Sequence, residues 1–363
     1  MPQYVRGVAS RQAHVALPEG TVEEEFGRGG FYGRASHLYR HNPPTGWSGI
    51  DGPLRPRALE LADLGAGHGD DAEDWPTVVL HNDEVALGVW QPRQLPGRYL
   101  RDADGDLVLF VHRGAGLLET DFGPLAYHPG DYLVLPRGTT FRFVPSAATW
   151  LLTIATTEEV GPPDRGLLGR HALWDESVVR VPEIDPHDEP GEFEVVVRAR
   201  GELTTIRYPF HPLDVVGWKG DLTAFALNVA DLRPVSSHSY HLPPSAHTTF
   251  TAGGAVICSF VPRPLETAPE ALKVPFYHRN IDYDEVIFYH EGDFFSRAGI
   301  SPGMLTWHPQ GIHHGPHPKA VEQAGSREFT DEVAVMIDAR RPLELTRRGA
   351  EVERESYWSS WQA

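Results

Sequence analysis

The stretch HRNIDYDEVIFYHEGDFFSRAGISPGMLTWHPQGIHHGPH, residues 278–317, decides the fold of this chain. It begins with His278, carries Glu285 seven positions later, turns at a Pro-Gly pair and reaches His314 near its end. In a small antiparallel barrel, one hairpin supplies a histidine and a carboxylate, and a later strand brings a second histidine to the same interior. Two imidazoles and one carboxylate on one face leave positions free on an octahedral metal, as in non-haem Fe(II) oxygenases. The stretch therefore predicts a β-barrel that binds a metal through His278, Glu285 and His314, which we call the triad.

An apolar version of the same pattern occurs earlier in the chain. LVLFVHRG at 107–114 aligns without gaps on EVIFYHEG at 285–292, an offset of 178 residues (285 − 107). PGDYLVLPRGTTF at 129–141 aligns on PGMLTWHPQGIHH at 302–314, an offset of 173 residues (302 − 129). Two like segments in the same order imply two copies of one barrel. We predict an all-β bicupin, with two double-stranded β-helix (jelly-roll) barrels, short helices and an irregular N-terminal segment.

The first copy is an internal control on the metal hypothesis. At the positions of the triad it has only apolar residues, namely Leu100, Leu107 and Phe141. Such side chains fill the interior of a small barrel, whereas an inward carboxylate without a partner is costly. We therefore predict that the first barrel binds no metal and that the second one does.

The choice of carboxylate needs a separate argument, because Asp282, Asp284 and Glu285 are all close to His278. Strand alternation puts Asp284 and Glu285 on opposite faces. The repeat places Glu285 opposite Leu107, seven positions before the glycine that ends the motif. Glu285 is therefore the predicted ligand.

Two more histidines accompany the triad. His308 lies six positions before His314, hence on the same face of a regular strand, and is a candidate for hydrogen bonding to the ligands or to a substrate. His313 alternates away from His314, as an outward or supporting residue.

Composition sets the outer bounds. The chain has 363 residues and a single cysteine, Cys258, so a disulfide framework is excluded and a reducing cytoplasm is the expected compartment. The first 20 residues lack a continuous apolar run, and no stretch is apolar over about 20 residues, so neither secretion nor membrane insertion is expected. A formal charge of −18 repels phosphate backbones and disfavours nucleic acid as a partner.

Composition shifts along the chain predict domain boundaries. We expect an N-terminal barrel without metal ligands at 1–165, a connecting segment at 166–192, the metal-binding barrel at 193–345 and a tail at 346–363. The pattern GAGHG at 65–69 is interpreted as a solvated loop, because no β-branched strand precedes it and an acidic run follows.

Three motifs resemble one known family. FYHRN at 276–280, HGP at 314–316 and VVGWKGDLTAFALN at 215–228 are similar to the homogentisate 1,2-dioxygenase family, most clearly over about residues 210–320. The resemblance implies a bicupin Fe(II) enzyme that opens the ring of a hydroquinone-type acid, with the triad as iron ligands and His308 beside the substrate. A small aromatic substrate and O2 are the implied partners, and we expect a homo-oligomer.

The sequence departs from the family pattern in three respects. Lys219 follows Trp218 where the family has a histidine, to which the resemblance assigns the acid/base role. Phe294 stands where the family has a tyrosine, and the spacing from His278 to Glu285 is one residue longer. A lysine removes a phenolic proton if burial lowers its pKa; the alternatives are that Lys219 binds a substrate carboxylate or is a solvated loop residue.

Other substrate contacts are predicted around these motifs. His238, His241 and His247, in SSHSYHLPPSAHTTF, are candidates for the mouth of the pocket. The predicted substrate-binding residues are Trp218, His247, Phe294 and His313.

A second class of function remains open. Cupins also include isomerases, lyases and small-ligand-binding proteins in which the same triad holds Zn(II), Mn(II) or Ni(II) without redox chemistry. Metal analysis together with oxygen uptake on hydroquinones discriminates the two classes.

Overall fold

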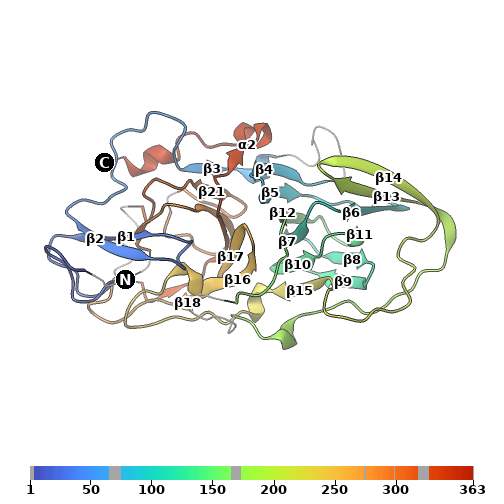
Figure 1. Ribbon diagram of the computed structural model, residues 1–363, viewed down its shortest axis with the longest axis horizontal. Helices are drawn as coiled ribbons and strands as arrows, with labels where there is room; N and C mark the ends of the chain where they lie inside the picture. The colour runs from blue at the N-terminus through green and yellow to red at the C-terminus, as the bar shows by residue number, and fades with distance from the viewer. Residues whose placement is uncertain are drawn as a thin grey trace.

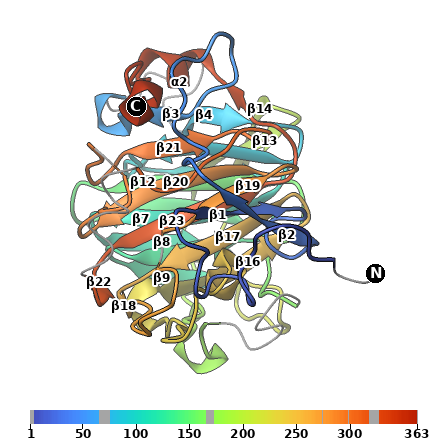
Figure 2. The same cartoon turned by 90° about the vertical axis from the view of Figure 1, so that its left-hand side faces the viewer.

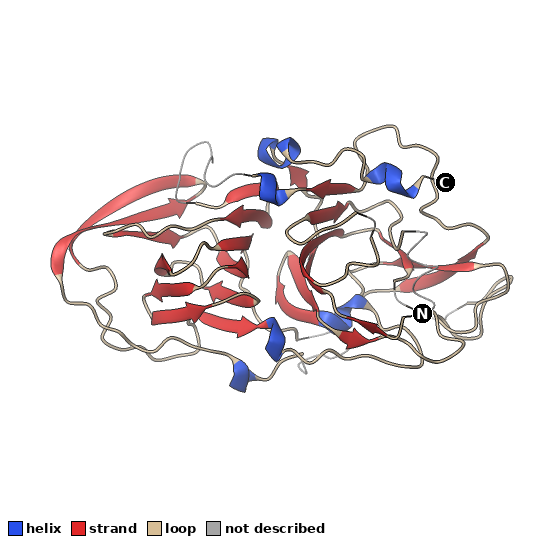
Figure 3. Cartoon of the chain, turned by 180° about the vertical axis from the view of Figure 1, so that it is seen from behind, coloured by secondary structure: helices blue, strands red, loops and turns tan. Residues whose placement is uncertain are grey.

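The computed structural model describes residues 4–64, 75–164, 173–273, 275–297, 299–317 and 327–362. Most regular structure in this part of the chain is β-strand, as Figure 3 shows, accompanied by one short α-helix. The helices are η1 (Leu61–Asp63), η2 (Glu176–Val178), η3 (Val229–Asp231), η4 (Pro244–His247), α2 (Arg347–Glu351) and η5 (Trp358–Trp361). No helix within the described ranges has the length and apolarity needed to cross a bilayer. The predicted loop at 65–69 lies outside the described residues.

Two barrels lie side by side (Figure 1), and their main sheets have the same strand order. In the first barrel the order is β10 (Asp131–Leu135), β7 (Asp106–Arg113), β12 (Trp150–Thr156), β5 (Val85–Trp90) and β4 (Thr77–His81). In the second it is β21 (Leu305–His308), β20 (Asp284–Glu291), β23 (Val333–Ala339), β17 (Ala255–Phe260) and β16 (Thr248–Ala252). The predicted bicupin fold is confirmed.

Strand register confirms the alignment of the two copies residue by residue. In the first barrel, Leu100 on β6 (Arg98–Asp102) pairs with Phe141 on β11 (Thr140–Pro145). In the second, His278 on β19 (Tyr277–Asn280) forms a β-bridge with His314. These are the positions that the repeat matched. The apolar pair is buried among other apolar side chains of the first barrel, whereas the histidine pair is part of the triad.

The first barrel also recruits strands from beyond the predicted connecting segment. Its second sheet runs β14 (Glu202–Phe210), β13 (Pro190–Ala199), β6, β11, β8 (Gly116–Thr120) and β9 (Gly123–Tyr127). A further strand, β15 (Phe225–Asn228), pairs with β10 at the edge of the main sheet. Strand pairing therefore groups residues 190–228 with the first barrel, although the sequence boundary assigned most of them to the second.

The N-terminal segment, expected to be irregular, contributes three strands to the second barrel. β1 (Val22–Gly27) pairs in parallel with β19 and antiparallel with β2 (Ala35–Arg40), and β3 (Arg57–Leu59) pairs with β21. Figure 2 shows β1 and β2 in front of that barrel. The remaining short strands are β18 (Arg263–Pro264), β22 (Phe329–Thr330) and β24 (Glu344–Leu345). These additions escaped prediction because most of these strands, β2 excepted, pair with residues distant in sequence.

The barrels meet through repeat-related residues of β7 and β20. The rings of Phe110 and Phe288 lie 6.3 Å apart, and Nδ1 of His112 lies 2.9 Å from Nδ1 of His290. Burial lowers the pKa of His112 to about 3, so this pair is neutral. One apolar core, to which both barrels contribute, fixes their relative position.

Candidate metal centre

The triad is assembled by strand pairing in the second barrel. His278 and His314 exchange two backbone hydrogen bonds, of 2.9 and 3.0 Å from N to O. The chain reaches this position because Gly315 follows: a Cβ there would lie 2.9 Å from the carbonyl oxygen of Phe276. Glu285 comes from the neighbouring β20 and points to the same interior. The His-Gly-Pro motif thus places the second imidazole beside the first.

The three side chains form a compact buried cluster. Nε2 of His278 lies 3.2 Å from Oε2 of Glu285, and Nε2 of His314 lies 3.7 Å from the same oxygen. The three residues are only 6%, 5% and 2% exposed, respectively. Neither ring nitrogen of His314 has a hydrogen-bond partner among the described residues. Because buried polar atoms are normally satisfied, this unpartnered imidazole beside a carboxylate fits a bound divalent metal ion.

The charge states suit metal binding. Burial alone would raise the pKa of Glu285, but His314 and hydrogen bonds from His278 and His308 outweigh it and hold the pKa well below its usual range. Burial, reinforced by His278, holds the pKa of His314 well below its usual value. A carboxylate and a neutral imidazole are the forms that coordinate metals.

Two further side chains, His308 and Arg297, contact the second oxygen of the Glu285 carboxylate. Nδ1 of His308 lies 3.0 Å from its Oε1, and Nη2 of Arg297 lies 3.5 Å from the same atom. His308 is completely buried, with its Nε2 3.4 Å from the hydroxyl of Tyr357 and its ring 6.1 Å from that of Trp361. The C-terminal segment, predicted only as a tail, therefore closes the side of the site opposite the pocket.

Asp284, the carboxylate next to Glu285 in the sequence, accepts hydrogen bonds on both of its oxygens from residues outside the triad. Its Oδ2 accepts hydrogen bonds from the indole of Trp307 and from the backbone N–H of Leu343, both at 2.8 Å. Its Oδ1 accepts from the backbone and side-chain nitrogens of Gln310, at 2.9 and 3.1 Å. Asp284 thus ties three segments together on the face of β20 away from the triad.

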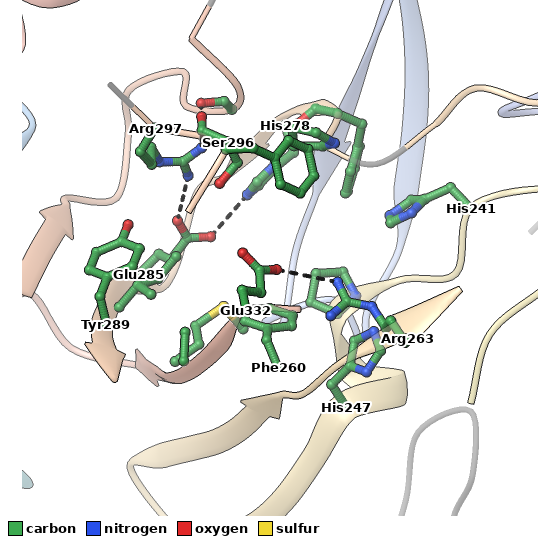
Figure 4. Close-up of a pocket in the computed structure, with 18 of the residues that line it drawn as sticks. His241, His247, Phe260, Arg263, His278, Glu285, Tyr289, Ser296, Arg297 and Glu332 are labelled. Atoms are coloured by element: carbon green, nitrogen blue, oxygen red, sulfur yellow. Dashed lines mark hydrogen bonds and ion pairs between the residues drawn. The ribbon is translucent and has the colours of Figure 1, made fainter. Parts of the chain in front are cut away.

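The triad opens on a pocket that encloses about 710 Å³, part of it open to solvent. Figure 4 shows His278 and Glu285 facing an interior that Arg263, Glu332, His241 and His247 border on the other side. Its apolar lining comes from Leu242, Pro244, Phe260, Pro275, Phe276, Ile287, Phe295, Ala334 and Met336. Its mixed lining fits a small aromatic molecule with a few polar groups.

Six ionisable side chains outside the triad line the pocket, namely His241, His247, Arg263, Tyr289, Arg297 and Glu332. Nη2 of Arg263 lies 3.7 Å from Oε1 of Glu332, and burial raises the pKa of Glu332. Burial lowers the pKa of His241 to about 4 and that of His247 well below its usual value. Both imidazoles are therefore neutral near pH 7 and are able to accept a proton.

The predicted substrate contacts divide between the pocket and other regions. His247 lines the pocket. Phe294 does not; it packs against Tyr289 in the core, with ring centroids 4.9 Å apart, and its neighbour Phe295 lines the pocket instead. His313 points outward and contacts the carboxylate of Glu24 on β1. His308 contacts Oε1 of Glu285 through its Nδ1 and is not among the residues that line the pocket.

Trp218 and Lys219, predicted as site residues, lie away from the pocket in this chain. Trp218 belongs to the first barrel, where its indole N–H donates to the carbonyl of Phe122 at 3.0 Å. Lys219 follows it as an exposed loop residue, and neither lines the pocket. In this chain the ammonium group of Lys219 is therefore exposed on the other barrel, away from the triad.

Sequence reasoning missed most of the polar pocket wall. Arg263, Arg297 and Glu332 carried no motif, and they come from strands or loops separated by more than 30 residues. His241 was recognised only as one of three histidines in a Pro- and Ser-rich stretch. A usable signal was the flanking Pro243–Pro244 pair, which begins η4 and fixes this segment against the barrel.

Comparisons with known proteins identify the family of this chain. Residues 84–229 match the family model described as homogentisate 1,2-dioxygenase N-terminal, and residues 232–363 match the C-terminal model of the same family. A protein of Saccharolobus solfataricus named "Putative dioxygenase" is 34% identical over 358 residues, which cover 93% of this chain and 92% of that protein.

More distant relatives carry the family's name. The homogentisate 1,2-dioxygenase of Sinorhizobium fredii is 28% identical over 282 residues, covering 72% of this chain but only 62% of that enzyme. Among solved structures, a cupin 2 conserved barrel domain protein from Leptotrichia buccalis superposes with a TM-score of 0.36 at 10% identity, covering 78% of this chain and 96% of that one. A score that low carries no functional argument. The two family models and the full-length relative establish that the chain belongs to the homogentisate 1,2-dioxygenase family.

Proposed function

We propose that this protein is an Fe(II)-dependent, extradiol-type ring-cleaving dioxygenase, and that its substrate is a hydroquinone-type aromatic acid such as homogentisate or a close analogue. One observation carries the proposal: the buried cluster of His278, Glu285 and His314 opens directly on a pocket with aromatic and cationic walls. Two imidazoles and a carboxylate are the ligand set of non-haem Fe(II) oxygenases. Bound iron would supply the site at which O2 and a phenolate meet.

The pocket walls support an aromatic, anionic substrate. Phe260, Phe276 and Phe295 offer apolar surface on which an aromatic ring packs. Two guanidinium groups line the pocket, and each faces a carboxylate: Arg263 lies near Glu332 and Arg297 near Glu285. A divalent metal ion held by the triad would add positive charge to this pocket and would favour a substrate that carries a carboxylate, which guanidinium groups bind through charge-assisted hydrogen bonds.

His241 is our candidate for the group that removes the phenolic proton, in place of Lys219. It is 4% exposed, lines the pocket, and is neutral near pH 7 because burial lowers its pKa. Its Nδ1 lies 3.5 Å from Oε1 of Glu266, so the carboxylate stabilises the imidazolium that forms when a proton arrives. Proton removal turns a phenol into a better metal ligand, which is the step that the protein side chains provide.

His308, Tyr357 and Arg297 act on the reaction through Glu285. Their contacts hold one carboxylate oxygen, Oε1, and leave Oε2 facing the two imidazoles. Fixing a ligand in this way keeps the metal-binding geometry constant as substrates enter and leave.

The proposal is tested by oxygen uptake. Protein reconstituted with Fe(II) under anaerobic conditions is mixed with air-saturated buffer and a panel of hydroquinones with and without a carboxylate side chain. We expect uptake that depends on iron and is fastest with the hydroquinone acids. Zinc-loaded protein of equal metal content is the matched control, with no uptake expected. Absence of uptake by the iron form across the panel would favour the non-redox class of cupins.

A further inference from the structure

A second group of imidazoles and carboxylates lies outside the pocket, where the N-terminal segment crosses the second barrel. Glu23 and Glu25 stand on the same face of β1, since strand residues two apart point to the same side. His37 lies opposite Glu25 in register on β2. His14, in the turn before β1, reaches the same cluster. Strands β1 and β2, which carry this group, face the viewer in Figure 2.

The distances in this group resemble those of the triad. Nδ1 of His14 lies 2.7 Å from Oε1 of Glu23, and Nδ1 of His37 lies 3.5 Å from the same oxygen. One candidate ligand atom from each of the three residues lies within 4.8 Å of the others. Nε2 of His14 also faces Oε2 of Glu25 at 3.7 Å. As in the triad, one carboxylate is held between two imidazoles.

We propose that His14, Glu23 and His37 form a second metal site, which binds a divalent transition-metal ion such as Zn(II). Two imidazole nitrogens and a carboxylate oxygen are standard ligands of such ions, and water completes the shell. Glu23 is 2% exposed and His14 8% exposed, whereas the half-buried His37 leaves a route for the ion from solvent. Glu25 is the nearest additional carboxylate.

Three observations favour a metal over a plain hydrogen-bonded cluster. The Nδ1 atoms of His14 and His37 are both buried, yet neither makes an aligned hydrogen bond to Glu23 despite the short distances. His14 has a φ of 63°, a left-handed conformation that is strained for a residue other than glycine. Two buried carboxylates, Glu23 and Glu25, place negative charge where a divalent cation would compensate it.

The strained turn contributes directly to the arrangement. The backbone N–H of His14 donates to both oxygens of Glu23, at 3.1 and 3.2 Å. These hydrogen bonds orient the Glu23 carboxylate toward the His14 ring. The backbone and the side chain of His14 together therefore fix the position of one candidate ligand, Glu23. Such strain is retained where the surrounding structure and its function require it.

Another cluster of similar composition lacks these features. His187, Glu189 and His211 lie close together on the first barrel. However, Nε2 of His211 is 2.7 Å from the hydroxyl of Tyr99, and its Nδ1 accepts a hydrogen bond from the backbone N–H of Leu213 at 3.2 Å. Both nitrogens of His211 are therefore engaged, and this cluster carries no proposal.

The test counts metal ions and is independent of activity. Full-length wild-type protein and variants are loaded with Zn(II), dialysed, and analysed for zinc per chain by mass spectrometry. We expect about two ions per wild-type chain, about one in Glu285→Ala, about one in His37→Ala and none in the double variant. His41→Ala is the matched control, because His41 is an exposed histidine just beyond β2, and it should keep the wild-type count.

The outcomes separate this proposal from the proposed function. One ion in wild-type protein with none in Glu285→Ala would overturn the second site and leave the triad untouched, as would a zinc count unchanged by His37→Ala. Circular dichroism checks folding of each variant. If His37→Ala does not fold, Glu285→Ala alone decides: one retained ion supports the site, and none overturns it. Loss of oxygen uptake has no bearing on either count.

Discussion

Replacing Asp284 or Glu285 with alanine separates a structural carboxylate from a metal ligand at adjacent positions. Asp284 is completely buried and accepts four hydrogen bonds, two of them from the buried Trp307 indole and Leu343 backbone N–H. Glu285 instead faces His278 at 3.2 Å. Asp284→Ala should therefore destabilise the fold and keep the metal, whereas Glu285→Ala should lose the ion at the triad.

The size of the stability effect follows from the donors that lose their acceptor. Each buried donor left without a partner costs about 1–3 kcal/mol, so Trp307 and Leu343 together give about 4 kcal/mol. The two donors of Gln310, a partly exposed residue, are replaced by water at little cost. At about 2 °C per kcal/mol for a chain of this size, Asp284→Ala should lower Tm by about 8 °C.

The assay combines differential scanning fluorimetry with metal analysis of the same samples at 20 °C, well below the expected Tm of either variant. We expect Asp284→Ala to keep the wild-type metal count and Glu285→Ala to have one ion per chain fewer. Equal loss of metal in both variants, or loss in Asp284→Ala alone, would show that the assignment of the carboxylate is mistaken.

Three further predictions concern proton transfer and the excluded lysine. His241→Phe should lower kcat about a hundredfold, the usual scale for a positioned proton acceptor, and should leave the metal content unchanged. His238→Ala, a change at an exposed histidine of the same segment, should leave kcat unchanged. Equal kcat values in the two variants would exclude His241 as the base. Lys219→Ala should change kcat and KM by no more than about twofold, as expected of an exposed residue, and a hundredfold loss of kcat would return the lysine to the mechanism. Burial lowers the pKa of His241 to about 4 in the folded chain, below the ordinary value of 6.5 in the unfolded chain. The free energy of unfolding should therefore fall by about 1.4 kcal/mol per pH unit as the pH drops from 6.5 toward 4. Thermal melts should find the Tm of His241→Phe less sensitive to acid than that of the wild type.

The internal repeat made much of the fold predictable. The alignment matched Leu100 and Phe141 to His278 and His314, and the structure pairs the two residues of each set, as expected for equivalent positions of two like barrels. The same reasoning chose Glu285 over Asp284; in the structure Glu285 contacts His278, whereas Asp284 accepts a hydrogen bond from Trp307.

Features built from residues distant in sequence were beyond such reasoning. β1 shows no clean alternation, because Glu23, Glu24 and Glu25 are all buried in charged contacts on the two faces of the strand. Lys219 was assigned from a local motif, but only tertiary structure reveals that its loop packs on the first barrel. A local sequence pattern predicts which residues of a strand share a face. It does not predict which loops pack together to form the wall of a pocket.

The most direct test of the proposed dioxygenase chemistry is isotope labelling of the product. Fe(II)-loaded wild-type protein is incubated with a hydroquinone acid under ¹⁸O2, and the products are analysed by mass spectrometry, with Glu285→Ala as the control. If His278, Glu285 and His314 hold iron for ring cleavage, the wild-type product is ring-opened and contains both oxygen atoms of one O2 molecule, and the control yields none. A product that retains its ring, or that carries no label from O2, would contradict the account.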